Sequence, residues 1–176
     1  VRTALAEYES RFLVGADGVN GVVARALRMV PERITALCLE SEVQVRANPA
    51  DLEDEVRIEF GAVPFGYGWV FPKGGHLSLG VGGLREKIRN PREYYDEFLV
   101  DQALLDDITS ERRQGWAIPI FAGGRNPIAT HRTALVGDAA ALVDPFLGEG
   151  IYYAIRSGQL AAQAMGEALE SGTGDA

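Results

Sequence analysis

Residues 137–150 read Gly137-Asp138-Ala139-Ala140-Ala141-Leu142-Val143-Asp144-Pro145-Phe146-Leu147-Gly148-Glu149-Gly150, and a long apolar helical run follows them. The stretch comes directly after a strand-like segment over residues 133–136. A Gly-Asp turn after a strand, and a second turn that opens onto a helix, present a carboxylate and free helix N–H groups to one ligand. Such a ligand would be extended, rich in hydroxyl groups and partly anionic. In the alternative, Asp138 caps a short helix over residues 139–143, and Gly148 and Gly150 only begin a core helix.

A similar strand-to-helix turn lies near the N-terminus. Residues 11–14 read as a strand and residues 22–27 as a short helix, with a glycine-rich turn between them. In the simplest interpretation Asp17 or Asn20 caps this helix. In a second interpretation, Asp17 and Arg25 form a polar pair that braces a dinucleotide site. Because the chain opens without Met, in what reads as a strand over residues 1–8, we expect a fragment of a longer protein.

The middle of the chain alternates apolar and polar residues with the period of β-strands that have one wet face. The alternating apolar sets are Val56, Ile58 and Phe60; Tyr67, Trp69 and Phe71; and Leu77, Leu79 and Val81. An aromatic set of this kind is more often part of a sheet core than the wall of a pocket. A pocket wall is the alternative, because neighbouring glycines would leave room for a flat or long ligand; they are Gly61, Gly66, Gly68, Gly74 and Gly75.

Helical segments flank these strands. Asn90-Pro91-Arg92-Glu93 is a helix start with an Asn cap and Pro at the first helical position, and we expect its helix to continue through Ala103 to residue 108. Residues 117–121 and 133–136 are predicted strands, and residues 150–169 are the predicted final helix. The predicted fold class is α+β (mixed α/β). An antiparallel sheet domain over residues 31–122 lies between two parts of an interrupted nucleotide-binding domain, residues 1–30 and 123–176.

The composition excludes several functions. A net charge of -8 argues against a nucleic-acid partner, which needs clustered Lys and Arg. Cys38 is the single cysteine, and His76 and His131 lack metal-ligand spacing, so we expect no metal site and a reducing, cytoplasmic setting. The sequence also lacks a Gly-x-Ser-x-Gly nucleophile turn, a phosphate loop and an apolar run of membrane-spanning length.

Together these motifs resemble the FAD-dependent para-hydroxybenzoate-hydroxylase-like superfamily. Its Asp-Gly motif with a following Arg is matched by Asp17, Gly18 and Arg25, and its Gly-Asp-Ala-Ala motif with a downstream Pro and Gly-x-Gly is matched by residues 137–150. Within it the chain is most similar to the geranylgeranyl reductase family. That family's Tyr-x-Trp-x-Phe-Pro and Gly-x-Gly signature is met by Tyr67, Trp69, Phe71, Pro72, Gly80 and Gly82. The resemblance spans residues 11–165.

The resemblance implies a role for each matched residue. The residues implied in FAD binding are Asp17, Gly18, Arg25, Gly137, Asp138, Pro145, Gly148, Glu149 and Gly150. Asp138 would hold the ribityl chain and pyrophosphate region, and the Pro145 turn would lie along the isoalloxazine ring. Glu149 fits this only if its carboxylate points away from the anionic edge of the flavin. The residues implied in lining a tunnel for an isoprenoid chain are Tyr67, Trp69, Phe71, Pro72, Gly80 and Gly82.

The implied reaction is the saturation of prenyl alkene bonds by hydride transfer from reduced flavin, with NAD(P)H or another reductant reloading the FAD. No catalytic residue is identified, and Tyr67 is the candidate proton donor. An isoprenoid or other apolar substrate also makes peripheral membrane association an expectation, although no segment encodes it. The oligomeric state is not encoded either.

Two departures separate the chain from the family pattern. Gly21 stands where the Asp-Gly motif has Ser, so a hydroxyl contact or a helix cap is lost there, which Asn20 would replace. The N-terminal Gly-x-Gly-x-x-Gly segment is absent, so we expect the 176-residue chain alone to bind FAD weakly or not at all and to be inactive. The alternatives are an aromatic monooxygenase or hydroxylase of the same superfamily, and a redox-inactive module that binds a lipid or a partner.

Overall fold

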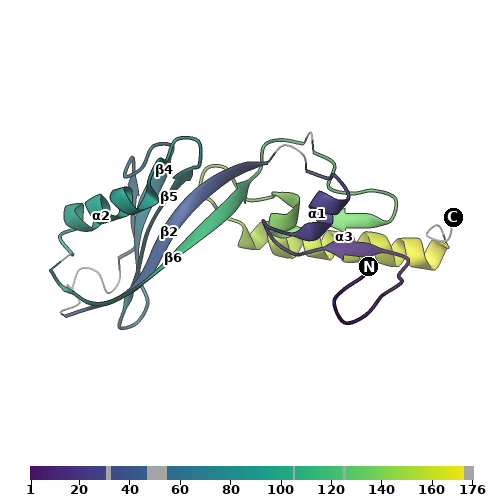
Figure 1. Ribbon diagram of the computed structural model, residues 1–176, viewed down its shortest axis with the longest axis horizontal. Coiled ribbons are helices and arrows are strands. Elements are labelled where there is room, and N and C mark those ends of the chain that lie inside the picture. The colour runs from purple at the N-terminus through teal and green to yellow at the C-terminus, as the bar shows by residue number, and fades with distance from the viewer. Residues whose placement is uncertain (31–32, 47–54, 105, 125, 173–176) are drawn as a thin grey trace. The chain divides into compact units, whose positions relative to one another are not determined.

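The chain has the mixed α/β fold that its sequence predicts, as the computed structural model shows (Figure 1). The structure describes residues 1–30, 33–46, 55–104, 106–124 and 126–172. Unit 1 combines Val1–Ile34 with Pro119–Ala176, and unit 2 is Thr35–Ile118. The chain therefore starts unit 1, builds unit 2 and returns to complete unit 1. No helix within the described residues has the length and apolar character needed to cross a membrane.

Unit 2 is built on a five-stranded sheet with the order β3-β4-β5-β2-β6. Its strands are β2 (Ile34–Val45), β3 (Arg57–Phe60), β4 (Gly66–Pro72), β5 (Leu77–Leu84) and β6 (Ile108–Ile120). β3 pairs antiparallel with β4, β4 with β5 and β5 with β2. The strand predicted at residues 117–121 corresponds only to the end of β6, which begins at Ile108.

The core of unit 2 lies between this sheet and α2 (Pro91–Asp101), which covers one face of it (Figure 1). Val70 on β4 and Leu79 on β5 are fully buried there, together with Phe98 on α2. Gly68 lies under Phe98, because a Cβ at this glycine would be 2.5 Å from the ring. Burying a side chain such as Leu79 stabilises the fold by roughly 1.5–3 kcal/mol. Alternate residues of the same strands point to the opposite face, which α2 does not cover.

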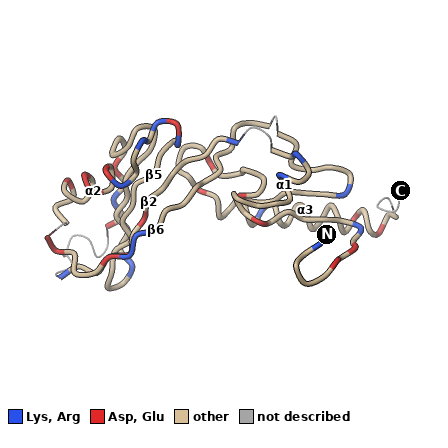
Figure 2. Tube along the Cα trace, viewed as in Figure 1, with Lys and Arg blue, Asp and Glu red and all other residues tan. Residues whose placement is uncertain are grey.

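Helix α2 begins as predicted but ends earlier. Asn90 Oδ1 accepts a hydrogen bond from the Arg92 N–H at 3.2 Å, and Asn90 Nδ2 donates to Glu93 at 2.8 Å. Figure 2 shows acidic residues along the helix. The predicted continuation to residue 108 is wrong, because the helix stops at Asp101 and Ala103 adopts a left-handed conformation with φ 54°.

Unit 1 contains a parallel pair of short strands, β1 (Leu13–Gly15) and β7 (Thr133–Leu135). Helix α1 (Val22–Ala26), the 3₁₀ turn η2 (Gly137–Ala140) and helix α3 (Ile151–Ser171) complete it. Gly172 ends α3 with φ 70°, a conformation that glycine adopts at low cost.

Residues 1–8 do not form the predicted strand. They make a tight turn in which Arg2 and Glu7 form an isolated bridge. The Thr3 hydroxyl accepts hydrogen bonds from the N–H groups of Leu5 at 3.2 Å and Ala6 at 3.0 Å. These local bonds to a side chain compete with strand pairing, which explains the failed prediction.

Candidate functional site

Asp17 follows β1 and caps α1. Its Oδ2 accepts hydrogen bonds from the Val22 N–H at 2.6 Å and the Val23 N–H at 3.0 Å. These bonds, that of Val23 foremost, hold the pKa of the Asp17 carboxyl below its usual value. Of the two caps expected from the sequence, Asp17 is therefore the one that forms. It leaves the adjacent Gly18 in a left-handed turn with φ 73°.

Gly21 is explained by this cap. A Cβ at Gly21 would lie 2.2 Å from Asp17 Oδ1, so the serine of the family motif would collide with the carboxylate as it stands here. The expectation that Asn20 replaces the lost cap is wrong, because Asp17 supplies it. The Arg25 guanidinium donates to the carbonyls of Asn20 at 3.0 Å and Gly21 at 3.4 Å. Asp17 and Arg25 thus have separate partners and do not make the predicted pair.

Asp138 stands on the η2 turn directly after β7. The N-cap of this turn is Val136 with no side-chain hydrogen bond, so the alternative in which Asp138 caps a helix over residues 139–143 is wrong. Gly137 has φ 54° and donates its N–H to Ser157 Oγ on α3 at 3.0 Å. Among the described residues the half-buried Asp138 carboxylate has no hydrogen-bond partner. Burial raises its pKa, and the positive charge of Arg33 opposes that rise.

The second turn of the motif brings its glycines to Asp138. Asp144 Oδ1 accepts hydrogen bonds from the N–H groups of Phe146 at 2.9 Å and Leu147 at 2.7 Å, which closes the loop around Pro145. Gly148 takes φ 70°. A Cβ at Gly150 would lie 3.1 Å from Val143 and 3.6 Å from Asp138 Oδ1. The backbone at the start of α3 therefore comes close to the carboxylate.

The Glu149 carboxylate turns back onto its own helix. Its Oε1 accepts a hydrogen bond from the Tyr152 N–H in the first turn of α3 at 2.7 Å. A carboxylate at this position is stabilised by the positive end of the helix dipole. The Glu149 carboxylate is thus hydrogen-bonded to the backbone at the start of α3.

Arg33 is a residue that the sequence reasoning missed. Its guanidinium donates to the carbonyl of Val19, and to the carbonyl of Ala139 at 3.1 Å. It therefore contacts both turns of the candidate site. No local sequence pattern predicts the contact with Ala139, because Ala139 lies 106 positions further along the chain.

The aromatic residues of unit 2 form a row on the sheet face opposite α2. Ring centroids of Phe60 and Tyr67 are 5.9 Å apart, those of Tyr67 and Trp69 also 5.9 Å, and those of Trp69 and Phe71 6.2 Å. Trp69 pairs across the strands with Gly80, and Pro72 at the end of β4 pairs with Leu77. The row is only partly buried, and Phe60 is 61% exposed. It offers a continuous apolar surface.

Two glycines on β5 give the Trp69 indole its place. A Cβ at Gly80 would lie 2.0 Å from Trp69 Cζ2, and a Cβ at Gly82 would lie 2.5 Å from Cys38 Sγ. The space left by these glycines is therefore filled by the protein's own indole and thiol. Burial raises the pKa of the Cys38 thiol to about 12, so the thiol stays protonated at neutral pH.

Charged residues border the aromatic row on β2. Ser78 donates to Glu40 at 2.8 Å, Glu42 forms an ion pair with Lys73 at 2.8 Å, and His76 Nε2 lies 2.8 Å from Glu42 Oε2. The bond from Lys73 is the main cause of a lowered pKa for Glu42. His76, isolated in the sequence, therefore contacts a carboxylate in the fold. Within the described residues, no group of His, Cys, Asp and Glu is arranged to hold a metal ion.

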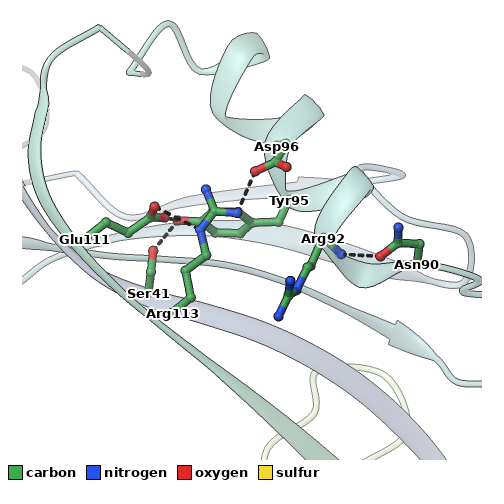
Figure 3. A network of polar contacts seen from close by, with 7 residues as sticks. All are labelled: Ser41, Asn90, Arg92, Tyr95, Asp96, Glu111 and Arg113. Atoms are coloured by element: carbon green, nitrogen blue, oxygen red, sulfur yellow. Dashed lines mark hydrogen bonds and ion pairs between the residues drawn. The ribbon is translucent and has the colours of Figure 1, made fainter.

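A separate polar network joins α2 to the sheet (Figure 3). The hydroxyls of Tyr95 and Ser41 are hydrogen-bonded, and Tyr95 donates to Glu111 at 2.8 Å. Arg113 binds Glu111 at 2.9 Å and Asp96 at 2.7 Å, and its guanidinium carbon lies 4.7 Å from the Tyr95 ring centre. Burial raises the pKa of Tyr95. None of the residues predicted for the site belongs to this network.

No protein-family model matches the chain. A digeranylgeranylglycerophospholipid reductase from Thermoplasma volcanium is 33% identical over 177 residues, which cover 94% of this chain and 43% of that protein. Digeranylgeranylglycerophospholipid reductase 2 from Methanothermobacter thermautotrophicus is 34% identical over 176 residues, 96% of this chain and 44% of that protein. The chain thus spans less than half the length of the curated relatives it matches.

Solved structures agree with these relatives. The crystal structure of a geranylgeranyl bacteriochlorophyll reductase-like protein from Thermoplasma acidophilum superposes with a TM-score of 0.72 at 28% identity, covering 94% of this chain and 43% of that one. The flavin-dependent halogenase CmlS, 21% identical with a TM-score of 0.66, covers 92% of this chain and 31% of its own and shares the fold. Within the part of those proteins that it spans, the chain is therefore a homologue of the geranylgeranyl reductase family, with the fold of FAD-dependent oxidoreductases.

Proposed function

We propose that the protein is a FAD-dependent reductase that saturates alkene bonds of geranylgeranyl or other isoprenoid lipids. The observation that carries the proposal is the close approach of Gly150 to the half-buried Asp138 carboxylate, in a chain related to geranylgeranyl-type reductases. NAD(P)H or another reductant that reloads the flavin is part of the proposal, as is peripheral contact with a membrane that supplies the lipid.

The residues of unit 1 fit a flavin. Asp138 has acceptor oxygens that are not used by the protein among the described residues, and ribityl hydroxyls are suitable donors for them. Gly148 and Gly150 carry no side chain that would hold a flat ring away from the backbone. The Glu149 carboxylate accepts a hydrogen bond from the Tyr152 N–H, which holds the carboxylate at the helix backbone. Asp17, Gly18 and Arg25 would support the site through the α1 turn.

When bound and reduced, FAD would supply the hydride for one alkene carbon. Asp138 would orient the cofactor, and the turns around Pro145 and Gly150 would let its ring approach the backbone. Because burial raises the pKa of Tyr67, its hydroxyl stays protonated at neutral pH and remains a candidate for the proton that the other alkene carbon needs.

The aromatic row of unit 2 suits an apolar chain. Burying each methylene of a prenyl chain against Tyr67, Trp69 and Phe71 would contribute about 0.8 kcal/mol. Gly80 and Gly82 act indirectly, because they seat Trp69 and Cys38 so that the indole forms part of the surface. Pro72 is the last residue of the strand that carries these aromatic residues.

The protein expressed from its complete coding sequence would test this proposal. With dithionite as reductant and a geranylgeranyl lipid as substrate, we expect products heavier by two hydrogen atoms for each bond reduced. Asp138→Asn removes a charge from the acceptor and should weaken FAD binding by roughly ten- to a hundredfold. Trp69→Ala should retain FAD but lose lipid turnover.

Trp116→Ala is the matched control, because Trp116 is 53% exposed and makes no ring pair with the row among the described residues. NAD(P)H-dependent oxygen uptake stimulated by a phenol, without lipid reduction, would identify a monooxygenase and contradict the proposal. A purified protein that binds the lipid but never FAD would be a binding module.

A further inference from the structure

Arg33 lies between the two turns of unit 1 that carry the candidate cofactor residues. It donates to the carbonyl of Val19, two residues after Asp17, and to the carbonyl of Ala139, directly after Asp138, at 3.1 Å. A guanidinium suits this position because its donors point in fixed, different directions. One partly buried side chain therefore contacts both halves of the site.

The charge of Arg33 acts on Asp138 as well. The half-buried Asp138 carboxylate would be driven toward its neutral form by desolvation, and Arg33 opposes this. The helices that contact η2 carry further charged groups: Arg25 on α1, and Arg156, Glu167 and Glu170 on α3, with Glu149 just before the start of α3. Arg25 is bound to carbonyls of its own turn, and Glu149 to the Tyr152 N–H.

We propose that Arg33 is a positioning residue of the cofactor site: its guanidinium holds the turn after Asp17 to the turn that carries Asp138, and it places a positive charge near the Asp138 carboxylate. This rests on the proposed function for its purpose, because an ionised carboxylate accepts stronger hydrogen bonds from ligand hydroxyls than a neutral acid. The contacts themselves belong to the chain whether or not FAD binds.

The experiment separates the effect of the Arg33 charge from that of its hydrogen bonds to the two turns. Asp138 would be titrated by carboxyl ¹³C NMR in the 176-residue chain and in three variants, Arg33→Gln, Arg33→Lys and Arg28→Gln. Arg33→Gln removes the charge, and the pKa of Asp138 should rise. Arg33→Lys keeps the charge but lacks the planar fork of the guanidinium, so the pKa of Asp138 should stay near that of the unchanged chain. Arg28 is exposed and lines a cavity of about 540 Å³ together with Arg33, so Arg28→Gln removes a nearby charge and should leave the pKa of Asp138 unchanged.

FAD affinity, measured across pH on the protein from the complete coding sequence, gives the second readout. Arg33→Gln should weaken FAD binding roughly tenfold, most strongly at acidic pH, and Arg33→Lys should lose less. An unchanged pKa of Asp138 in a folded Arg33→Gln chain would overturn the inference, as would an equal rise in Arg33→Lys. A protein that binds no FAD while the pKa still responds would contradict the proposed function and leave the role of Arg33 toward Asp138 standing.

Discussion

At the scale of single residues, the glycines of the family signature have a physical reason. Gly80 and Gly82 do not leave an open groove; their missing side chains make room for the Trp69 indole and the Cys38 thiol. The glycines expected to open a pocket have other places. Three of them take positive φ: 93° at Gly61, 54° at Gly74 and 113° at Gly75. The other two lie against the fold, because a Cβ at Gly66 would be 1.9 Å from the carbonyl oxygen of Gly82 and a Cβ at Gly68 would be 2.5 Å from the Phe98 ring.

Gly80→Ala tests this seating. The added methyl would collide with Trp69 and should lower the free energy of unfolding by about 1–3 kcal/mol. Gly158→Ala in α3 is the matched control, because a Cβ there meets nothing within 4 Å, and it should stabilise the helix by roughly 0.5–1 kcal/mol. Urea denaturation measures both. Adding Trp69→Leu to Gly80→Ala should recover part of the loss; if it recovers none, the indole is not what Gly80 accommodates.

At the scale of elements, helix α2 is fastened to the sheet by buried polar atoms as well as by apolar side chains. Tyr95 is fully buried, and its hydroxyl reaches Ser41 on β2 and Glu111 on β6 (Figure 3). Hydrogen bonds of this kind stabilise a fold modestly, but a partner left unpaired in the interior is costly. The network therefore fixes where α2 lies on the sheet more than it adds to its stability.

Tyr95→Phe should cost about 1–3 kcal/mol in the free energy of unfolding, because it leaves the buried Ser41 hydroxyl without this partner. Tyr94→Phe, one position earlier on the same helix, removes a hydroxyl from a partly buried ring and should change stability by less than about 0.5 kcal/mol. Equal effects in thermal unfolding would show that the network does not act as described.

The elements also show what could be predicted from the sequence. The start of α2 was predictable because Asn90, Pro91 and Glu93 act within one turn, whereas its end depends on Ala103 taking a left-handed conformation that alanine rarely adopts. The first half of β6 was missed because Ser110-Glu111-Arg112-Arg113-Gln114 has no apolar alternation. Pairing with β2 makes it a strand.

At the scale of the whole molecule, the two units each carry a carboxylate whose pKa is lowered. Asp17 in unit 1 is held by backbone N–H groups and Glu42 in unit 2 chiefly by Lys73. The motifs of both units were recognisable in the sequence, because each lies within a short stretch. The contact of Arg33 with both turns of unit 1 was not, since it joins segments that are distant in the chain.

These two carboxylates predict an acid-sensitive fold. A carboxyl group with a lowered pKa in the folded state stabilises the fold above its unfolded pKa of about 4, and this contribution is lost as the pH falls through the folded value. Asp17→Asn and Glu42→Gln should therefore flatten the loss of thermal stability below about pH 4. Asp138 has the opposite sign, since its pKa is raised, and Asp138→Asn should not flatten that loss. Differential scanning calorimetry at stepped pH measures all three.

The seating of Trp69 on Gly80 also gives the protein an optical reporter. Trp69 and Trp116 are its two indoles, so Trp116→Phe leaves a single emitter at the centre of the aromatic row. That indole lies beside the Cys38 thiol, against bare backbone and partly open to solvent. The wavelength of its emission maximum would depend on the polarity of whatever covers the row. Binding of an apolar chain there should therefore shift the emission to the blue, without any added label.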